Sequence, residues 1–223
     1  MNNTVTNTAR LLGAGLRALL VLTLVTGVIY PLVVTGIAQA LFHDKANGSE
    51  IKADGKVVGS SLIGQSYDLP LKKGQQTPAA DLRWFQGRPA NGLGSNSVNT
   101  QYKLVLSGAT NLSADNKDLI QQVKDAKAAV IKDNSVPGYT VRASEVPADA
   151  VTSSASGLDP NISPQYARIQ VHRVAEKSHL SVAQVERLVN DHTQGRTLGF
   201  MGEPRVNVLE LNIALKSLVA KTS

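Results

Sequence analysis

The chain contains no cysteine and few aromatic residues, at 4% of its 223 residues. Disulfide bonds and thiolate chemistry are therefore excluded, and a zinc site would need histidine and carboxylate ligands alone. The four histidines, His43, His172, His179 and His192, do not lie at ligand spacing. We expect them to be solvated or capping residues, and no metal to be bound by this chain.

Clustered cations with interleaved aromatics, the pattern of a nucleic-acid-binding surface, are also missing. The net charge is +6, and the charges of the chain alternate in sign. We therefore expect no nucleic-acid partner.

The common catalytic and phosphate-binding motifs do not occur: GxxxxGK[ST], GxGxxG, HExxH, GxSxG and the phosphorylated DKTGT of P-type ATPases. Ser49-Glu50-Ile51-Lys52 matches the SxxK of penicillin-binding enzymes, but no SDN or KTG accompanies it. It also lies close to a long apolar run. The residues by themselves indicate a non-enzymatic protein.

That apolar run is the strongest feature present. From Ala18 to Phe42, 25 consecutive positions lack Asp, Glu, Lys and Arg. As a helix the run would span about 37 Å, enough to cross a hydrocarbon core of about 30 Å. Ala38-Gln39-Ala40 resembles a signal-peptidase site, so a cleaved secretory signal is the alternative. Signal sequences contain only about 7–15 apolar residues, so we predict a retained transmembrane helix at 16–42.

Charge predicts the orientation of this helix. Arg10 and Arg17 flank its N-terminal side, and the first acidic residue of the chain is Asp44. The positive-inside rule then places residues 1–15 in the cytoplasm and residues 43–223 outside, as a soluble extracytoplasmic domain. The chain is predicted to be single-pass and to contact membrane lipid through 16–42.

One side of the predicted anchor carries small or weakly polar residues at i+4 spacing: Thr23, Gly27, Pro31, Thr35 and Gln39. We call these five residues the anchor ridge. Small residues allow transmembrane helices to approach closely, so the ridge predicts contact with a partner helix. The alternative is that Gly and Thr are simply common in membrane helices. Pro31 removes one backbone hydrogen bond and predicts a kink.

The soluble part is predicted to have an α/β fold of the α+β type, with a short strand pair and several helices in one mixed domain. Asp54-Gly55, between Ile51 and Val57-Val58, is a hairpin signal. Helices are predicted at Lys117–Lys132, after the Ser163 cap to about Lys177, and from the Ser181 capping box to about His192. Arg205–Leu218 is ambiguous, and we favour a helix capped by Asn207. Tyr102–Leu106 is either a short strand or a helical turn.

Trp84 and Phe85 are predicted to anchor the following loop to the core. Arg88 lies between Gly87 and Pro89, on a constrained turn. A guanidinium held there can clamp a carboxylate or a phosphate, or it can simply brace the loop. The role of Asp159 is equally open from the sequence.

Five stretches, taken in order, resemble the KdpC family, the C subunit of the bacterial Kdp potassium-transporting ATPase. The resemblance runs from the anchor nearly to the C-terminus, and SASGLDP is its most specific part. The stretches are Gly59–Gln65 (GSSLIGQ), Trp84–Pro89 (WFQGRP), Ser107–Leu112 (SGATNL), Val151–Pro160 (VTSSASGLDP) and Val206–Asn212 (VNVLELN).

The resemblance implies a subunit of an inner-membrane complex that imports potassium at the expense of ATP. Its implied partners are a channel-like potassium-binding subunit and a P-type ATPase subunit. The family's C subunit catalyses nothing itself. It is assigned the role of a catalytic chaperone that raises the ATP affinity of the ATPase subunit.

The family's suggested nucleotide motif resembles the LSGGQ signature of ABC transporters. The matching residues here are Leu106, Ser107, Gly108, Ala109 and Thr110, and they imply ATP as a cofactor. Ala109 replaces a glycine and adds a methyl group, and Thr110 replaces a glutamine and loses its amide.

The predicted orientation conflicts with this implied role, because it places residues 43–223 outside, where ATP is scarce. An external domain suits covering or shaping the potassium entrance of the channel-like subunit. A free-standing anchored envelope protein, either a binding protein or a hydrolase, is the alternative from a different class. No nucleophile–base arrangement in the sequence supports the hydrolase.

Overall fold

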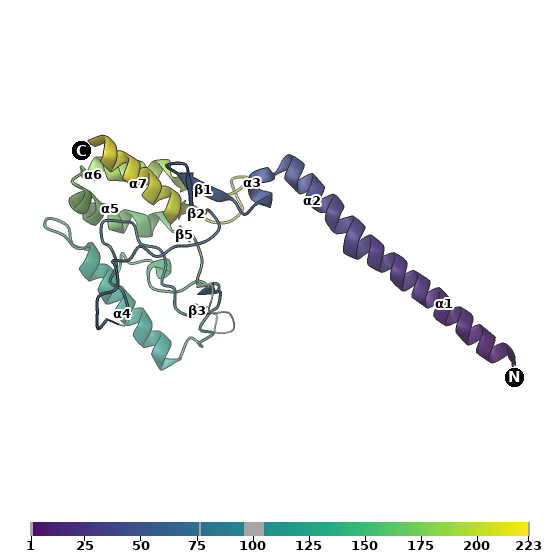
Figure 1. Cartoon of the computed structure of the whole chain (residues 1–223). Coiled ribbons are helices and arrows are strands. Elements are labelled where there is room, and N and C mark those ends of the chain that lie inside the picture. Colours follow the sequence, from purple (N-terminus) through teal and green to yellow (C-terminus); the bar gives the residue numbers. More distant parts are fainter. Residues whose placement is uncertain (1, 76, 96–104, 223) are drawn as a thin grey trace. The chain divides into compact units, whose positions relative to one another are not determined.

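The computed structural model describes residues 2–75, 77–95 and 105–222. The chain divides into two compact units, residues 1–50 (unit 1) and 51–223 (unit 2), and Figure 1 shows their elements in order. The predicted fold class is confirmed: one long apolar N-terminal helix is followed by a mixed α/β part with short sheets and several helices.

Unit 1 is a nearly continuous helix. It consists of α1 (Asn2–Leu24), a π-helical turn (Val25–Ile29), α2 (Tyr30–Leu41) and the short α3 (His43–Ala46). Among the described residues, Thr4–Leu41 is the one helix that is long and apolar enough, by length and composition, to cross a membrane. A crossing needs only about 20 residues, so this 38-residue helix has length to spare. The predicted membrane boundaries at 15/16 and 42/43 stay predictions.

The π-helical turn explains how the helix accommodates Pro31. The Tyr30 N–H donates to the carbonyl of Val25, five residues back. Pro31 follows directly and has no N–H to continue the ordinary i→i−4 pattern. Such π-bulges are a common way for a helix to absorb a local break in its hydrogen bonding. The break in hydrogen bonding that Pro31 predicts is thus accommodated by the π-helical turn Val25–Ile29, which lies just before Pro31.

The part of unit 2 that the structure describes contains three small sheets. β1 (Glu50–Ala53) pairs with β2 (Lys56–Ser60) across Asp54 and Gly55, which both have positive φ, at 53° and 75°. Two central residues with positive φ define the hairpin turn that Asp-Gly favours, so the predicted hairpin is confirmed. β3 (Gly94–Ser95) pairs antiparallel with β4 (Val105–Leu106). The undecided stretch Tyr102–Leu106 is therefore strand at its last two residues, and Tyr102–Leu104 lies outside the described residues.

The helices of unit 2 begin where the sequence predicts. α4 (Lys117–Asn134) is capped by Asn116, and α5 (Pro164–Ser178) by Ser163, whose hydroxyl accepts from the N–H of Tyr166. α6 (Val182–Asp191) has the complete Ser181/Gln184 capping box. A short 3₁₀ turn, Ala148–Ala150, precedes β5 (Asn161–Ile162). These caps satisfy N–H groups that have no partner within their helices.

The ambiguous segment 205–218 contains both kinds of structure. Arg205–Asn207 is strand β7, the central strand of the antiparallel order β5-β7-β6, where β6 is Thr193–Gln194. α7 then runs over Val208–Thr222, and the Asn207 side chain accepts from the N–H of Glu210. The favoured helix and its Asn207 cap are confirmed from residue 208 onward. Residues 205–207 are a strand because Val206 pairs with a neighbour on each side.

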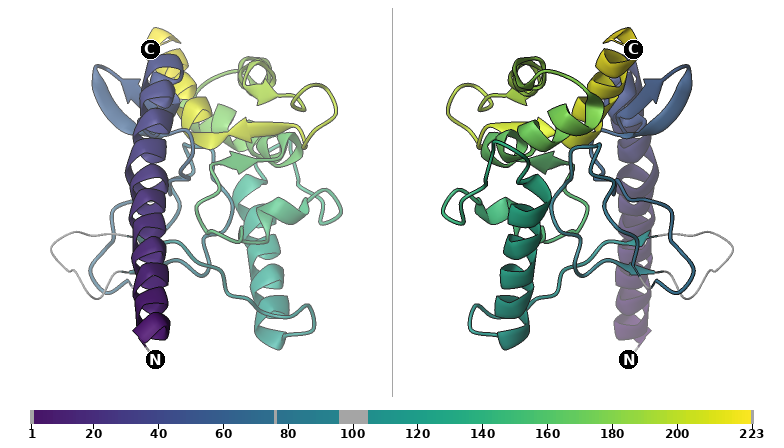
Figure 2. Two further views of the ribbon diagram at one scale, coloured as in Figure 1. Left: turned by 90° about the vertical axis from the view of Figure 1, so that its right-hand side faces the viewer. Right: turned by 90° about the vertical axis from the view of Figure 1, so that its left-hand side faces the viewer.

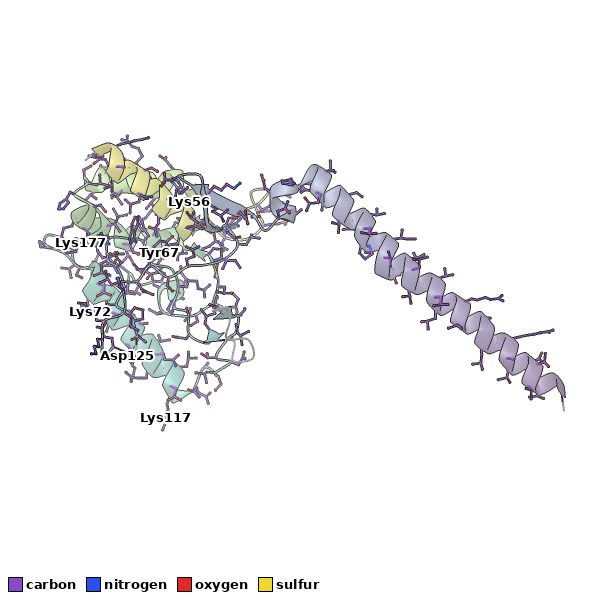
Figure 3. All side chains as sticks on the ribbon, in the orientation of Figure 1. Lys56, Tyr67, Lys72, Lys117, Asp125 and Lys177 are labelled. Atoms are coloured by element: carbon purple, nitrogen blue, oxygen red, sulfur yellow. The ribbon has the colours of Figure 1, made fainter. Side chains whose placement is uncertain are left out.

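The core of unit 2 lies where α5, α6, α7 and β7 pack together, at one end of the unit in Figure 1. α5 contributes more buried residues to it than any other element, and the C-terminal part of α4 joins it through Val130 and Asn134. Phe85 is fully buried and Trp84 packs against the same cluster, so the predicted anchoring of their loop is confirmed. In Figure 3, Tyr67 lies among packed side chains, whereas Lys72, Lys117 and Lys177 lie at the periphery of the unit.

Buried polar side chains hold the irregular segment 82–86 inside this core. The Asn212 amide bonds both the N–H and the carbonyl of Phe85, each at 2.9 Å. The Gln170 amide does the same for Gln86, at 2.7 and 3.1 Å. Buried backbone groups outside regular structure need such partners. Arg173 also donates to carbonyls of this segment and to the side chains of Asn134 and Gln170. We call these four buried residues the polar staple: Asn134, Gln170, Arg173 and Asn212.

Candidate functional site

The loop at residues 151–160, which we call the central loop, contacts all four of the other stretches that carry the family resemblance. Its carbonyl oxygens accept from the Gly64 N–H at 2.8 Å, the Gly108 N–H at 3.1 Å and the Val208 N–H at 3.0 Å. Arg88 reaches the same loop from the fourth stretch. Residues far apart in the sequence are thus joined in one cluster.

Arg88 binds the central loop through its whole guanidinium group. Nη1 donates to the Asp159 carboxylate at 3.0 Å, and Nε and Nη2 donate to the Thr152 carbonyl at 3.4 Å. Nη2 also donates to the Ser153 carbonyl at 3.3 Å. The second Asp159 oxygen accepts from the N–H of Asn161. The sequence left open whether Arg88 clamps a ligand or braces the loop. These contacts favour loop bracing, because the carboxylate that Arg88 binds is that of Asp159 in the same chain.

We expect Arg88→Met and Asp159→Asn to be strongly coupled in a double-mutant cycle on the free energy of unfolding. Both side chains are more than two-thirds buried, at 23% and 30% exposed. Their coupling should therefore reach about 1 kcal/mol, the upper end for partly exposed pairs. Urea unfolding of the full-length chain measures it.

The exposed pair Arg142 and Glu145 provides the matched control. Solvent screens this pair, so its coupling should be weaker. Equal coupling in the two pairs would contradict a bracing role for Arg88.

Two glycines permit the close approach of backbones in this cluster. A Cβ at Gly64 would lie 2.6 Å from the Asp159 carbonyl oxygen, and one at Gly108 would lie 2.8 Å from the Gly92 carbonyl oxygen. Neither position has room for a side chain. These glycines therefore serve packing of the loops against each other.

The five residues matched to the nucleotide signature lie at the edge of this cluster. Leu106 belongs to β4, and the Ser107 hydroxyl donates to the Ser156 carbonyl at 3.0 Å. The Gly108 N–H is bonded to the same carbonyl. Ala109 and Thr110 line a cavity of about 330 Å³. Part of the signature is thus used within the fold, and part of it faces a cavity.

The chemistry of this cavity is neutral. Its lining combines hydroxyl and amide side chains with a few apolar ones: Asn91, Ala109, Thr110, Asn111, Leu112, Leu119, Gln122, Val151, Thr152, Ser153, Ser154 and Ala155. Among the lining residues that the structure describes, none carries a charge. A phosphate group here would be held by neutral donors, without the cation that phosphate sites usually provide.

The anchor ridge lies along unit 1. A Cβ added at Gly27 would meet only the Thr23 methyl group, at 4.0 Å, so the helix itself has room for a side chain there. The Gln39 amide is paired with that of Asn47, at 3.1 and 3.2 Å. A hydrogen bond from Gln39 to a partner helix would therefore compete with this local pair.

The histidines have roles within the fold. His172 stacks on Tyr139 with ring centroids 3.8 Å apart, His192 Nδ1 lies 2.8 Å from the Leu188 carbonyl, and His179 ends α5 in a left-handed conformation. Across the described residues, no group of three His, Cys, Asp or Glu side chains is arranged to hold a metal ion.

The polar staple is the feature that sequence reasoning missed. Its signal is nevertheless present: Gln170 and Arg173 interrupt an otherwise apolar face of α5, at positions flanked by Ala167, Val171 and Val174. Polar residues on a buried helix face require partners. This pattern predicts a buried polar network, but it does not identify the partners.

Comparison with known proteins gives a consistent result over nearly the whole chain. The sequence model of the family described as "KdpC: K+-transporting ATPase, c chain" matches residues 12–217. A protein of Streptomyces avermitilis named "Potassium-transporting ATPase KdpC subunit" is 77% identical over 220 residues, which cover 99% of each chain. Proteins with the same name from Streptomyces coelicolor and Mycobacterium tuberculosis are 73% and 43% identical. Those matches cover 99% and 91% of this chain and 98% and 96% of the relatives.

Proposed function

The chain belongs to the KdpC family, the c chain of the K+-transporting ATPase, and on this premise we propose that it serves assembly and regulation of a potassium-import complex from outside the cytoplasm. As a member of this family it is an accessory subunit of the complex and not the catalytic enzyme itself. Its partners in the proposal are a channel-like potassium-binding subunit and a P-type ATPase subunit in the bacterial inner membrane, with lipid around the anchor. In this position unit 2 covers or shapes the potassium entrance of the channel-like subunit.

The single observation that carries this proposal is the close family match over the whole chain, in a protein that combines one long apolar helix with a loop-braced unit 2. Arg88 and Asp159 bind each other, and this brace within unit 2 suits a binding and stabilising role. Purification of the tagged chain in mild detergent tests it, because two larger membrane proteins should be recovered together with the chain. Recovery of the chain alone would favour a free-standing anchored envelope protein.

We predict the orientation to be N-terminus inside. Because the chain lacks cysteine, single cysteines at Thr8, Lys72 and Lys117 can be labelled with a membrane-impermeant maleimide in intact cells. The side chains of Lys72 and Lys117 lie at the periphery of unit 2 (Figure 3). We expect labelling at Lys72→Cys and Lys117→Cys and none at Thr8→Cys, as the positive-inside rule requires. Labelling of unit 2 only in inverted vesicles would contradict this orientation.

A second candidate function is direct contact with ATP at residues 106–110, in the chaperone role that the family resemblance implies. The observation in its favour is the cavity of about 330 Å³ beside Ala109 and Thr110, which lies in the size range of small-molecule sites. The neutral lining and the predicted external orientation weigh against it. Hydrogen exchange on the intact complex tests it, because bound ATP should protect the backbone of this segment. Unchanged exchange at saturating ATP would exclude the contact.

A further inference from the structure

The loop between β6 and β7 exposes large apolar side chains in close sequence. We call residues 196–203 the finger loop; it projects beside β6 and β7 in both views of Figure 2. Leu198 is 78% exposed, Phe200 71% and Met201 48%. Leu198 and Phe200 have the highest exposed fractions among the large apolar side chains described in unit 2. Single exposed apolar residues are ordinary, but a cluster of them indicates an interaction site.

The finger loop is closed by bonds at its base. The backbones of Thr197 and Met201 exchange two hydrogen bonds, each of 2.9 Å. Arg196 and Glu203 form an ion pair just outside these two residues. Arg196 Nη2 donates to both Glu203 carboxylate oxygens, at 3.1 and 2.8 Å. The loop continues directly into β7, whose Val206 is fully buried. The apolar tip is therefore presented in a defined conformation.

The conformation of the tip is unfavourable for the residue that occupies it. Leu198 has φ of 54°, in the left-handed region that non-glycine residues rarely adopt. Strained backbone and exposed apolar surface both cost free energy, and most of the Leu198 and Phe200 side-chain surface stays unburied within the described residues. Strain of this kind is characteristic of binding and functional segments. Contact with another molecule would recover the cost by burying the tip.

The charges of the finger loop favour a protein over a lipid surface as that molecule. Segments that bind membrane surfaces combine apolar tips with unpaired Lys or Arg, which attract anionic lipid. Here the one cation, Arg196, is paired with Glu203, so the loop has no net charge. An exposed aromatic beside a leucine, on a preformed turn, is instead typical of an anchor that enters an apolar pocket of a partner protein.

We propose that the finger loop docks Leu198 and Phe200 into an apolar pocket on another subunit of the same potassium pump. This proposal rests on the proposed function, because it takes the partner from the pump. It adds the surface of unit 2 that makes the contact and the chemistry of the site that receives it. Docking a preformed loop loses little conformational entropy, which favours binding.

Site-specific photo-crosslinking in native membranes tests the proposal. Phe200→p-benzoylphenylalanine, introduced in the full-length chain within its complex, should crosslink to a pump subunit that is identified by mass spectrometry. The matched control is Leu71→p-benzoylphenylalanine, an apolar position that is also mostly exposed (57%) and lies in an ordinary loop. We expect a crosslinked yield at position 200 at least about tenfold above that at position 71, as for a contact with an interface anchor.

A second variant tests the contribution of the two side chains. Leu198→Ser/Phe200→Ser should lower the recovery of the larger subunits by at least about tenfold after a stringent detergent wash, whereas Leu71→Ser should not. Crosslinking at position 200 only to lipid, only to a second copy of this chain, or to nothing would overturn the proposal. If the wild-type chain still brings down the pump subunits, these outcomes contradict only the docking role of the finger loop and leave the proposed function intact. If the wild type is recovered without them, the proposed function fails as well.

Discussion

Arg173→Met should lower the free energy of unfolding by about 3–5 kcal/mol, because it removes several buried hydrogen bonds from a charged donor, each worth about 1.5–3 kcal/mol. Arg173 is 1% exposed and lies at the centre of the polar staple. Its Nε donates to Asn134 at 2.8 Å and its Nη2 to Gln170 at 2.7 Å. Nη1 donates to the carbonyls of Leu82 and Trp84. Methionine fills part of the volume but can donate a hydrogen bond to none of these acceptors.

Lysine should not rescue this position. Burial lowers the pKa of Arg173 to about 10, which still leaves the guanidinium charged at neutral pH. The acceptors are distributed around a planar group whose nitrogens point in different directions. A lysine ammonium places all its donors on one atom, so it cannot reach them together. We therefore expect Arg173→Lys to be destabilised almost as much as Arg173→Met.

Urea unfolding of the full-length chain in detergent, followed by the fluorescence of the single tryptophan, measures both variants. Trp84 is a suitable reporter because its carbonyl accepts from Arg173. Arg168→Met on the same helix is the matched control, since Arg168 is exposed and a surface change should stay within about 0.5 kcal/mol. A change below about 1 kcal/mol for Arg173→Met would contradict the importance of the polar staple.

Gly27→Ile should lower the recovery of the larger pump subunits at least tenfold, a change of about 1.4 kcal/mol or more in association. An added side chain at Gly27 has room within its own helix, where only Thr23 lies near. A loss of assembly would therefore arise from a clash with a partner helix that approaches the anchor ridge closely. The tagged chain, solubilised in mild detergent, provides the measurement.

Gly36→Ile is the matched control for this experiment. Gly36 lies in α2, one residue after Thr35, and thus about 100° around the helix from that ridge residue. A Cβ there meets nothing within 4 Å. We expect the Gly36→Ile variant to recover the larger pump subunits about as well as the wild type does. Equal losses in both variants, or in neither, would contradict a partner contact confined to the anchor ridge.

Local structure was largely predictable because its causes lie in neighbouring residues. The Asp54-Gly55 turn, the Ser163 and Ser181 caps and the apolar run of unit 1 are all contained within a few turns of chain. The same applies to the backbone defect at Pro31, although its form, a π-helical turn, emerged only from the structure. Arg205–Asn207 differs because its strand conformation comes from two neighbouring strands supplied by other parts of the chain.

One long apolar helix followed by a mixed α/β part could be predicted from the amino-acid sequence, and the order of the five characteristic stretches indicated the family. How those stretches contact one another became evident only from the folded arrangement. Arg88 meets Asp159 across 71 positions of sequence, and Phe85 meets Asn212 across 127. Periodicity and capping signals act over a few residues and carry no information about such distant pairs. Their partners are selected when the core brings buried polar groups together, because each of these groups must be satisfied within the fold.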